Sequence, residues 1–319
     1  MSVTQSARVK TLRHEAEGVL SVELWPADAA DFAPFTAGSH IDLHLPGGLV
    51  RSYSLMNCSS ERNRYVVAVL NDRNSRGGSR WLHEQLKVAA PLSISVPRNN
   101  FPLDESAAHS VLVAGGIGIT PLYSMCLRLL ALGKSVELIY CVRSRHEAAL
   151  LDALAQLGLR ATYHFDDEQG AAPDLLALLR GRPADAHFYC CGPAPMLTAF
   201  EQATEALGHG HVHIERFAAI AAPEIAEAKP LQGYEVVLSA SAQTLLVPPG
   251  QSLLDALLDA GVEVEYSCCE GICGACETRV LEGEVEHYDS VLSRAQRESN
   301  KVMMVCVSRS CGGRLVLDL

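Results

Sequence analysis

Four cysteines lie within ten residues of the chain, in the segment SCCEGICGAC at positions 267–276. Three of them, Cys268, Cys273 and Cys276, have the spacing C-x4-C-x2-C, which is typical of the ligands of a plant-type [2Fe–2S] cluster. Such a cluster needs a fourth thiolate from a distant strand, and Cys306 in MMVCVSRS is placed to supply it. The pattern therefore predicts an iron–sulfur centre near the end of the chain.

Two further cysteines compete for places in this pattern. Cys269 would give C-x3-C-x2-C, so it falls outside the expected spacing, and Cys311 lies in SRSCGG, which is typical of a turn. Gly271 and Gly274 give the loop the unusual backbone angles that wrapping a cluster requires. The alternatives are a structural zinc site, which usually takes two closely spaced pairs of ligands, and disulfides, which are rare in a reducing compartment.

A glycine-rich turn suggests a second kind of chemistry. VAGGIGITPLYSM places Gly115, Gly116 and Gly118 directly after an apolar run and before a helical pattern. Glycines at such a turn let the backbone approach a pyrophosphate, and the helix N-terminus favours the anion. We expect Thr120 to cap this helix and Pro121 to occupy its first turn. Because the third glycine of G-x-G-x-x-G is missing, a turn that serves only packing is the alternative.

A later segment, CCGPAPML, repeats the same arrangement. Cys191, Gly192 and Pro193 come at the carboxyl end of another expected strand. In an open α/β sheet ligands bind outside the carboxyl ends of the strands, so both segments would meet at one edge. Together they predict a nicotinamide nucleotide site.

The segment RSYS at positions 51–54 could bind a phosphate and an aromatic ring. Arg51 offers a fork of donors, the serines offer hydroxyl groups, and Tyr53 offers an aromatic face. Taken alone, such residues are more often an ordinary strand surface. A second glycine-rich segment before a helix, SRGGSRWLHE at positions 75–84, favours an anion site in the same domain.

The elements that must position these residues fall into three groups. Residues 1 to about 100 show short alternating strands separated by turn signals, typical of an antiparallel barrel or sandwich. From about 109 strands alternate with helices, including helices expected at 120–133 and 146–158 and a strand at 160–167, which predicts a parallel sheet with helices on both faces. Residues 218–232 resemble a linker. The remainder shows a hairpin, a helix, the cysteine loop and closing strands.

Composition and charge exclude several classes of protein. With 48% hydrophobic and 20% charged residues, the chain has the composition of a folded protein rather than a disordered one. A net charge of −11 argues against nucleic acid as a partner. Residues 230–319 hold 13 acidic and 6 basic residues, so about −7 of this charge lies in the cysteine-rich part and could steer a basic partner. Lacking a secretory or membrane-spanning apolar segment, the protein is expected to be cytoplasmic and not to bind a membrane.

Taken together, RSYSL with SRGGS, GGIGITP, CCGP and the cysteine loop with the ending LVLDL resemble the phthalate dioxygenase reductase family and the related vanillate O-demethylase reductases. The resemblance covers the whole chain in the family's order. It implies a multidomain fold: an antiparallel β-barrel for FMN (1–103), an α/β parallel-sheet nicotinamide domain (104–217), a linker (218–232) and a C-terminal α+β plant-type ferredoxin of the β-grasp type (233–319).

The resemblance also assigns residues to each cofactor. FMN would be held by Arg51, Ser52, Tyr53, Ser54, Ala68, Val69, Leu70, Gly77, Gly78, Ser79, Thr120 and Phe217. The nicotinamide side would be lined by Gly116, Gly118, Cys191, Gly192, Pro193 and Met196. The [2Fe–2S] ligands would be Cys268, Cys273, Cys276 and Cys306.

Two features depart from the family pattern. Cys269 leaves a thiol beside the cluster, where it could be sensitive to oxidation. The strand ending YCVRSRHE carries Arg143 and Arg145 in place of an acid that would bind the ribose hydroxyls of NAD, and an arginine can accept the 2′-phosphate of NADPH. We expect NADH as the donor, with NADPH as the alternative. FAD remains an alternative to FMN, although no segment between Ser79 and Pro102 stands out as an adenine site.

The expected function is that of an oxygenase reductase. Hydride would pass from NADH to FMN, a step for which no side-chain acid or base is required. Single electrons would then pass through the cluster to a Rieske-type terminal oxygenase. The alternatives are an electron-transfer or redox-sensing iron–sulfur flavoprotein that serves another acceptor, such as a cytochrome P450, and a zinc-stabilised interaction protein.

Overall fold

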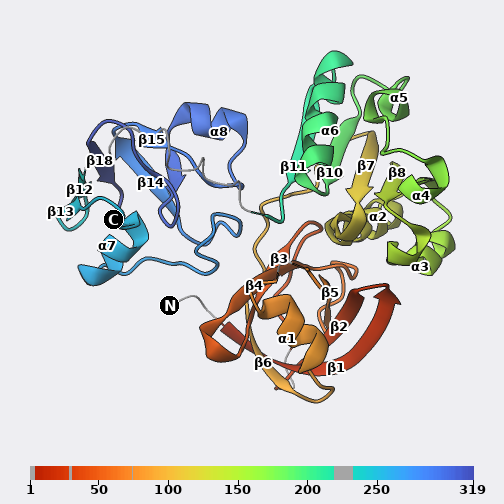
Figure 1. Cartoon of the computed structure of the whole chain (residues 1–319), viewed down its shortest axis with the longest axis horizontal. Helices are drawn as coiled ribbons and strands as arrows, with labels where there is room; N and C mark the ends of the chain where they lie inside the picture. The colour runs from red at the N-terminus through yellow and green to blue at the C-terminus, as the bar shows by residue number, and fades with distance from the viewer. Residues whose placement is uncertain (1–3, 29–30, 74, 219–232) are drawn as a thin grey trace. The chain divides into compact units, whose positions relative to one another are not determined.

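The computed structural model of the chain consists of two units, residues 3–217 and residues 218–319 (Figure 1). It describes residues 4–28, 31–73, 75–218 and 233–319. Apart from residue 218, the linker expected at 218–232 lies outside the described residues.

The first sheet is antiparallel throughout and has the strand order β4-β3-β6-β1-β2-β5. A bridge between Leu55 and Val67 joins the two outer strands, so the sheet closes into the expected barrel. The barrel is filled by a core that includes Ile41, Leu43 and Ile94. Its elements are β1 (Thr4–Ala16), β2 (Val19–Pro26), β3 (His40–His44), β4 (Val50–Ser54), β5 (Tyr65–Leu70), β6 (Pro91–Ser95) and the short helix α1 (Gly78–Glu84).

The second sheet is parallel and has the order β11-β10-β7-β8-β9. The chain runs outward from β7 to β9 and then returns to place β10 on the other side of β7. The strand order therefore reverses between β7 and β10, which is where open α/β sheets bind ligands. The strands are β7 (His109–Gly115), β8 (Ser135–Val142), β9 (Arg160–Phe165), β10 (His187–Cys191) and β11 (His211–Glu215).

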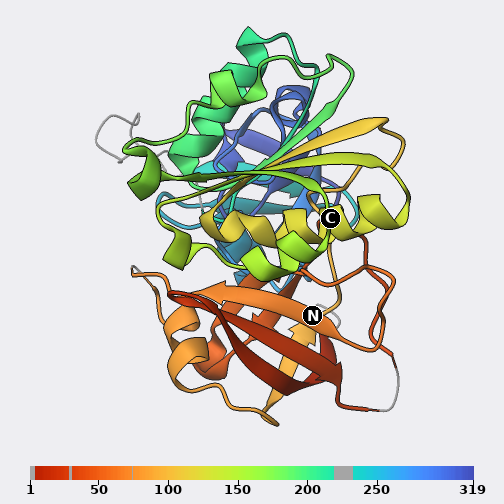
Figure 2. The same cartoon turned by 90° about the vertical axis from the view of Figure 1, so that its right-hand side faces the viewer.

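Helices cover both faces of this parallel sheet, as predicted. One core joins the sheet to α2 (Ile119–Ala131) and α3 (Leu151–Gln156). The other joins it to α5 (Leu175–Leu179) and α6 (Ala194–Ala206). The first core also contains barrel residues, among them Met56, so α2 lies between the sheet and the barrel (Figure 2).

Three local predictions for this half were wrong. The helix expected at 146–158 is reduced to a 3-10 turn (Arg145–Glu147) followed by α3, because Leu150 adopts a left-handed φ of 64° where residues 148–150 turn into the core. The strand expected at 160–167 ends at Phe165, where α4 (Asp166–Gln169) begins. Thr120 does not cap α2, since its hydroxyl donates a hydrogen bond to the Ile117 carbonyl.

The second unit is built on a mixed sheet with the order β13-β12-β18-β14-β16. Strands β12 and β18 run parallel, and the remaining pairs are antiparallel. Ser252 caps helix α7, whose apolar side packs against the sheet. The elements are β12 (Tyr234–Leu238), β13 (Gln243–Val247), α7 (Leu253–Asp259), β14 (Glu277–Glu282), β15 (Val285–Glu286), α8 (Arg294–Ser299), β16 (Val302–Met304), β17 (Arg309–Ser310) and β18 (Arg314–Leu317).

None of the helices in the described part of the chain combines the length and the apolar character needed to cross a bilayer.

Candidate functional site

Four of the cysteines in the second unit come together as two pairs. The Cys268 thiol is hydrogen-bonded to that of Cys273, and the Cys276 thiol to that of Cys306. Three of these four residues are buried, and Cys268 is partly buried. Two pairs are what a [2Fe–2S] cluster uses, with two thiolates on each iron.

The surroundings of these sulfur atoms suit an anionic group. The backbone N–H of Glu270 lies 3.4 Å from Cys268 Sγ, and that of Cys268 lies 3.5 Å from Cys273 Sγ. The hydrogen bond from Cys273 lowers the pKa of Cys268 to about 6 and raises the pKa of Cys273 itself. Cys306 likewise lowers the pKa of Cys276. Each pair thus readily holds one thiolate, the form that binds iron.

The two cysteines outside the expected ligand set are both exposed. Cys269 is exposed, with a left-handed φ of 56° that turns its thiol toward the Ser267 carbonyl. Cys311 is exposed as well. The sequence predicts Cys306 on a strand, but it lies in the turn that directly follows β16. A turn leaves more of its backbone N–H groups free to face sulfur than a paired strand does.

In the barrel, Arg51 on β4 reaches across to the glycine turn before α1. Its guanidinium donates to the carbonyls of Val50 and Arg76, at 2.7 and 3.3 Å. A Cβ atom at Gly78 would lie 2.6 Å from the Arg51 side chain, so only glycine leaves room for this arrangement. Beside it, the Ser79 hydroxyl donates to Ser75 at 2.8 Å. The structure therefore brings the two predicted phosphate-binding segments together.

The other residues of β4 are anchored to the neighbouring strand β3, and one of them carries a buried hydroxyl group without a partner among the described residues. Ser52 donates to the carboxylate of Asp42 at 2.6 Å, and Asp42, itself 1% exposed, pairs with Arg98. Burial raises the pKa of Tyr53. The hydroxyl of Ser54 is buried and has no hydrogen-bond partner among the described residues. A buried polar atom without a partner usually awaits a ligand or water, and the polar edge of a flavin ring would provide one.

Strand β5 forms the other side of this region. Ala68 and Val69 are buried, whereas Leu70 is exposed. Residues of β5 approach the 3-10 turn Gly116–Gly118 that precedes α2, where Thr120 is buried. Phe217, the last residue of the first unit, is exposed. The barrel strands thus meet the glycine turn of the parallel sheet.

The turns after β7 and β10 touch each other at the point where the strand order reverses. A Cβ atom at Gly118 would lie 2.1 Å from the Cys191 carbonyl oxygen. One at Gly115 would lie 2.5 Å from Met196 Sδ and 2.7 Å from Pro193. Gly116 has a φ of 52°. These glycines therefore allow two backbones to meet at the carboxyl edge, and the predicted nicotinamide residues lie at one place.

Sequence reasoning missed Glu215, the last residue of β11. It pairs in register with Cys191, whose Sγ lies 3.9 Å from its Oε2. Burial of the carboxyl group raises the pKa of Glu215 to about 8, although part of the residue is exposed to solvent. The segment HIERF at positions 213–217 could have pointed to Glu215, because it ends a strand at the same edge of the sheet as CCGP.

The two arginines after β8 differ in their surroundings. Arg145 stacks on the ring of Phe165 at 4.3 Å and pairs with Glu168 at 3.1 Å. Arg143 is exposed and forms no ion pair with a described residue, while its carbonyl accepts a hydrogen bond from Asp167 N. Only Arg143 therefore offers an uncommitted guanidinium to a phosphate.

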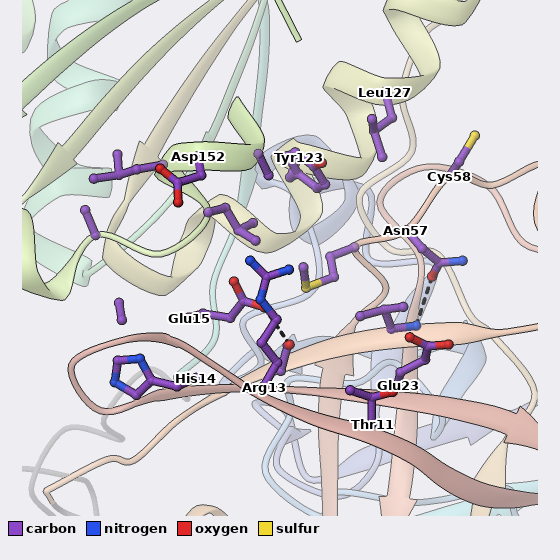
Figure 3. A pocket seen from close by; sticks show the side chains of 18 of the residues that line it. Thr11, Arg13, His14, Glu15, Glu23, Asn57, Cys58, Tyr123, Leu127 and Asp152 are labelled. Carbon is purple, nitrogen blue, oxygen red and sulfur yellow. Dashed lines mark hydrogen bonds and ion pairs between the residues drawn. The ribbon is translucent and has the colours of Figure 1, made fainter. Parts of the chain in front are cut away.

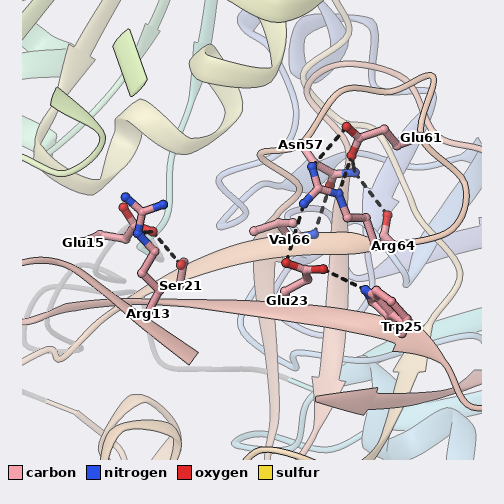
Figure 4. A network of polar contacts seen from close by, with 9 residues as sticks. All are labelled: Arg13, Glu15, Ser21, Glu23, Trp25, Asn57, Glu61, Arg64 and Val66. Carbon is pink, nitrogen blue, oxygen red and sulfur yellow. Dashed lines mark hydrogen bonds and ion pairs between the residues drawn. The ribbon is translucent and has the colours of Figure 1, made fainter. Parts of the chain in front are cut away.

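A cavity of about 690 Å³ lies between the β1–β2 hairpin and helices α2 and α3 (Figure 3). Its polar side chains pair with one another: Ser21 donates to Glu15 at 2.6 Å, and Glu61 accepts from Asn57 and Arg64 (Figure 4). Arg145 lines it, but none of the residues assigned to the flavin or to the nicotinamide does. The cavity is therefore distinct from the region between β4, β5 and the glycine turns.

Comparison with known proteins matches both units. Residues 236–311 match the family of 2Fe-2S iron-sulfur cluster binding domains, and residues 95–214 match the N-terminal domain of dimethylamine monooxygenase subunit DmmA-like proteins. The chain is 48% identical to the phenoxybenzoate dioxygenase subunit beta of Ectopseudomonas oleovorans over 98% of this chain and 97% of that one.

Two solved structures resemble the whole chain. Phthalate dioxygenase reductase, described as a modular structure for electron transfer from pyridine nucleotides to [2Fe–2S], is 36% identical with a TM-score of 0.71, over 99% of this chain and 98% of that one. An intact type IV self-sufficient cytochrome P450 monooxygenase is 40% identical with a TM-score of 0.90, over 99% of this chain but 41% of that longer one.

Proposed function

The chain belongs to the family of oxygenase reductase subunits that includes phthalate dioxygenase reductase, and from this membership we propose which residues hold each redox group and where the electrons go. Like its relatives, it is an NAD(P)H-dependent oxidoreductase of a multicomponent oxygenase system, with FMN, NADH and a [2Fe–2S] cluster as cofactors.

Each cofactor is assigned to one part of the chain. We assign FMN to residues 1–103, the nicotinamide to 104–217 and the cluster to 233–319, with 218–232 as the linker. Two observations support the flavin assignment: the buried, unpartnered hydroxyl of Ser54 and the contact of Arg51 with Gly78. The two cysteine pairs support the cluster, with Cys268 and Cys273 on one iron and Cys276 and Cys306 on the other.

Bound FMN would supply the uptake of two electrons as hydride and their release one at a time to a [2Fe–2S] cluster. The task of the protein is orientation. Gly118 and Cys191 bring two strand ends together at the edge where the nicotinamide would lie. The buried hydroxyl of Ser54, which has no partner among the described residues, could form a hydrogen bond with the flavin. Arg51 would bind the phosphate that anchors it.

The relatives imply an oxygenase as the electron acceptor, and we propose that it is a Rieske-type terminal component. Exposed acidic residues lie on α7 and in the segment leading to the cysteine loop, namely Asp255, Asp259, Glu263 and Glu265. Tyr266, directly before the loop, is 42% exposed. Such a surface fits a basic partner with an aromatic contact at its centre. The cytoplasmic location stays a prediction.

A second candidate acceptor is a cytochrome P450, because a P450 fusion protein matches 99% of this chain with a TM-score of 0.90. Electron delivery to a separately added Rieske oxygenase and to a P450, measured side by side at equal cluster reduction, would decide between them.

The observation that carries the proposal is the convergence of the four thiols in two pairs. Its test is an anaerobic titration of the purified protein with NADH, followed by visible absorbance and EPR. Flavin bleaching together with a rhombic [2Fe–2S] signal is expected. A coloured protein that neither NADH nor NADPH reduces would contradict the reductase assignment and leave an electron carrier.

A further inference from the structure

Three ionisable side chains, two of them buried and one partly exposed, lie together beside the cysteine loop. His287 and Asp289 follow strand β15, and Arg297 reaches them from helix α8. The side chain of His287 is 6% exposed and that of Asp289 is 0% exposed. His287 Nδ1 lies 3.7 Å from Asp289 Oδ2, and Arg297 Nη2 lies 3.9 Å from Asp289 Oδ1. Both distances are too long for a hydrogen bond.

Some polar atoms of this group form hydrogen bonds, and others have no hydrogen-bond partner among the described residues. Asp289 Oδ1 accepts from the backbone N–H groups of Val291 and Leu292, and Arg297 donates to the Asp289 carbonyl. Asp289 Oδ2, both ring nitrogens of His287 and Arg297 Nε are buried and have no hydrogen-bond partner among the described residues. Four such atoms in one place are unusual, because buried polar groups are nearly always paired.

One added proton would repair much of this deficit. A neutral imidazole has one N–H group, whereas the imidazolium has two and carries a positive charge. Protonated at both nitrogens, His287 could form a charge-assisted bond to Asp289 Oδ2 after a shift of less than about 1 Å. Burial lowers the pKa of His287; the charge of Asp289 raises this pKa, and the charge of Arg297 lowers it.

This group is in direct contact with the loop that carries three of the cluster cysteines. Ser290 N donates to the Gly271 carbonyl at 2.8 Å, and a Cβ atom at Gly271 would lie 3.0 Å from Asp289 Cα. Gly271 stands between Cys268 and Cys273. An electron added to the cluster therefore places negative charge close to a buried carboxylate and a neutral imidazole. The low local dielectric strengthens the interaction of that charge with both groups, which favours protonation of the imidazole.

The other charged groups near His287 compensate one another. Glu286 and Tyr288, its neighbours in the chain, both bond to Arg309 on β17, at 2.6 and 2.8 Å. Among the described residues around His287, the group of His287, Asp289 and Arg297 thus combines buried charge with unsatisfied hydrogen-bonding atoms.

We propose that His287 is a redox-linked proton acceptor: when one electron reaches the cluster, one proton from solvent binds the imidazole against Asp289, and it leaves again when the electron passes on. One N–H bond forms for each electron taken up, and no other bond changes. The inference rests on the proposed function only in that the cluster is present and redox-active. Because proton uptake stabilises the reduced cluster, the cluster potential would fall as pH rises, which makes the cluster harder to reduce and a stronger donor to the acceptor.

The test is an EPR-monitored redox titration of the full-length holoprotein with dithionite over a range of pH. We expect a pH window in which the cluster potential falls by about 59 mV per unit, the one-electron equivalent of a tenfold change. His287→Gln should abolish this slope while keeping the cluster. His209→Gln is the matched control, since both ring nitrogens of His209 are also buried without partners but lie in the first unit, and it should keep the slope.

A flat potential in the wild type, or an unchanged slope in His287→Gln, overturns the proposal. If His287→Gln fails to retain its cluster, Arg297→Gln takes its place: removing the positive charge should move the sloping window to higher pH, and an unmoved window would overturn the idea. Reduction by NADH is measured separately, so failure of the reductase assignment would be recognised as such.

Discussion

Cys191 Sγ lies 3.9 Å from Glu215 Oε2, where the adjacent strands β10 and β11 end side by side at the nucleotide edge of the parallel sheet. Burial raises the pKa of Glu215 to about 8, so the folded protein holds a proton there that the unfolded chain has lost above its ordinary pKa. The contribution of Glu215 to the free energy of unfolding is therefore fully present below about pH 4.5 and is lost as pH rises toward 8.

Glu215→Gln should flatten this part of the stability curve. One proton accounts for at most about 1.4 kcal/mol per pH unit, and the partial exposure of Glu215 reduces the slope below that limit. The measurement is the melting temperature of the first unit by calorimetry between about pH 5 and pH 9. A variant that loses stability with pH as steeply as the wild type would show that Glu215 is not the group responsible.

Gly118→Ala should damage nucleotide use. Its new Cβ would lie 2.1 Å from the Cys191 carbonyl oxygen, so the turns after β7 and β10 would have to separate. We expect a destabilisation of about 1–3 kcal/mol, typical of overpacking, and at least a tenfold slower bleaching of the flavin by NADH. Gly210→Ala is the control, because nothing lies within 4 Å of its added Cβ and its φ is ordinary. Equal rates in the two variants would contradict the assignment of this edge.

Asp42→Asn tests how the flavin strand is held. Asp42 is almost fully buried and binds both Ser52 and Arg98, so removal of its charge breaks the ion pair with Arg98. Breaking such a buried pair typically costs about 3–5 kcal/mol, and we expect FMN to dissociate roughly tenfold more readily, measured by fluorescence of released flavin. The exposed pair Glu105–Arg128 supplies the control: Glu105→Gln should cost less than about 1 kcal/mol and leave flavin binding unchanged.

The strands were predictable because their patterns reflect burial. Alternation in Val19–Pro26 and the apolar run in His109–Gly115 correspond to a strand with one buried face and a strand buried on both faces. What failed was local and depended on tertiary packing. Leu150 interrupts a helix that its neighbours favour, because residues 148–150 fill the core under α2.

Motif spacing placed the candidate cysteines and glycines but not the residues that support them. Asp42 and Arg98 are 56 positions apart, and they meet because β3 is paired with β6 and His40 is bridged to Arg98 just beyond it. Glu215 was visible in HIERF, yet its link to Cys191 depends on strand register. The buried group around His287 gave no pattern at all in the sequence, because its members become neighbours through the packing of α8.

Arg143→Ala should shift the choice of nucleotide. Arg143 has no ionic partner among the described residues, whereas Arg145 is already engaged by Glu168 and Phe165. If Arg143 binds the 2′-phosphate, its loss should lower kcat/KM for NADPH about tenfold, equivalent to about 1.4 kcal/mol, with little change for NADH. Arg145→Ala should change the NADPH to NADH ratio much less. The ratio is measured by flavin reduction in stopped flow, and no change in Arg143→Ala would exclude a role for that residue.

Cys306→Ser should abolish the iron–sulfur centre, whereas Cys311→Ser should leave it intact. Cys306 is buried against Cys276, and Cys311 is exposed. A serine hydroxyl is a poor substitute for the thiolate that iron prefers, so the pair on one iron would be broken. The measurements are iron and sulfide per flavin and the EPR signal of the reduced protein. Cys269→Ser should also keep the centre, and because it removes the exposed thiol beside the loop, it should slow loss of the EPR signal under peroxide. A cluster that survives in Cys306→Ser but not in Cys311→Ser would move the fourth ligand to Cys311.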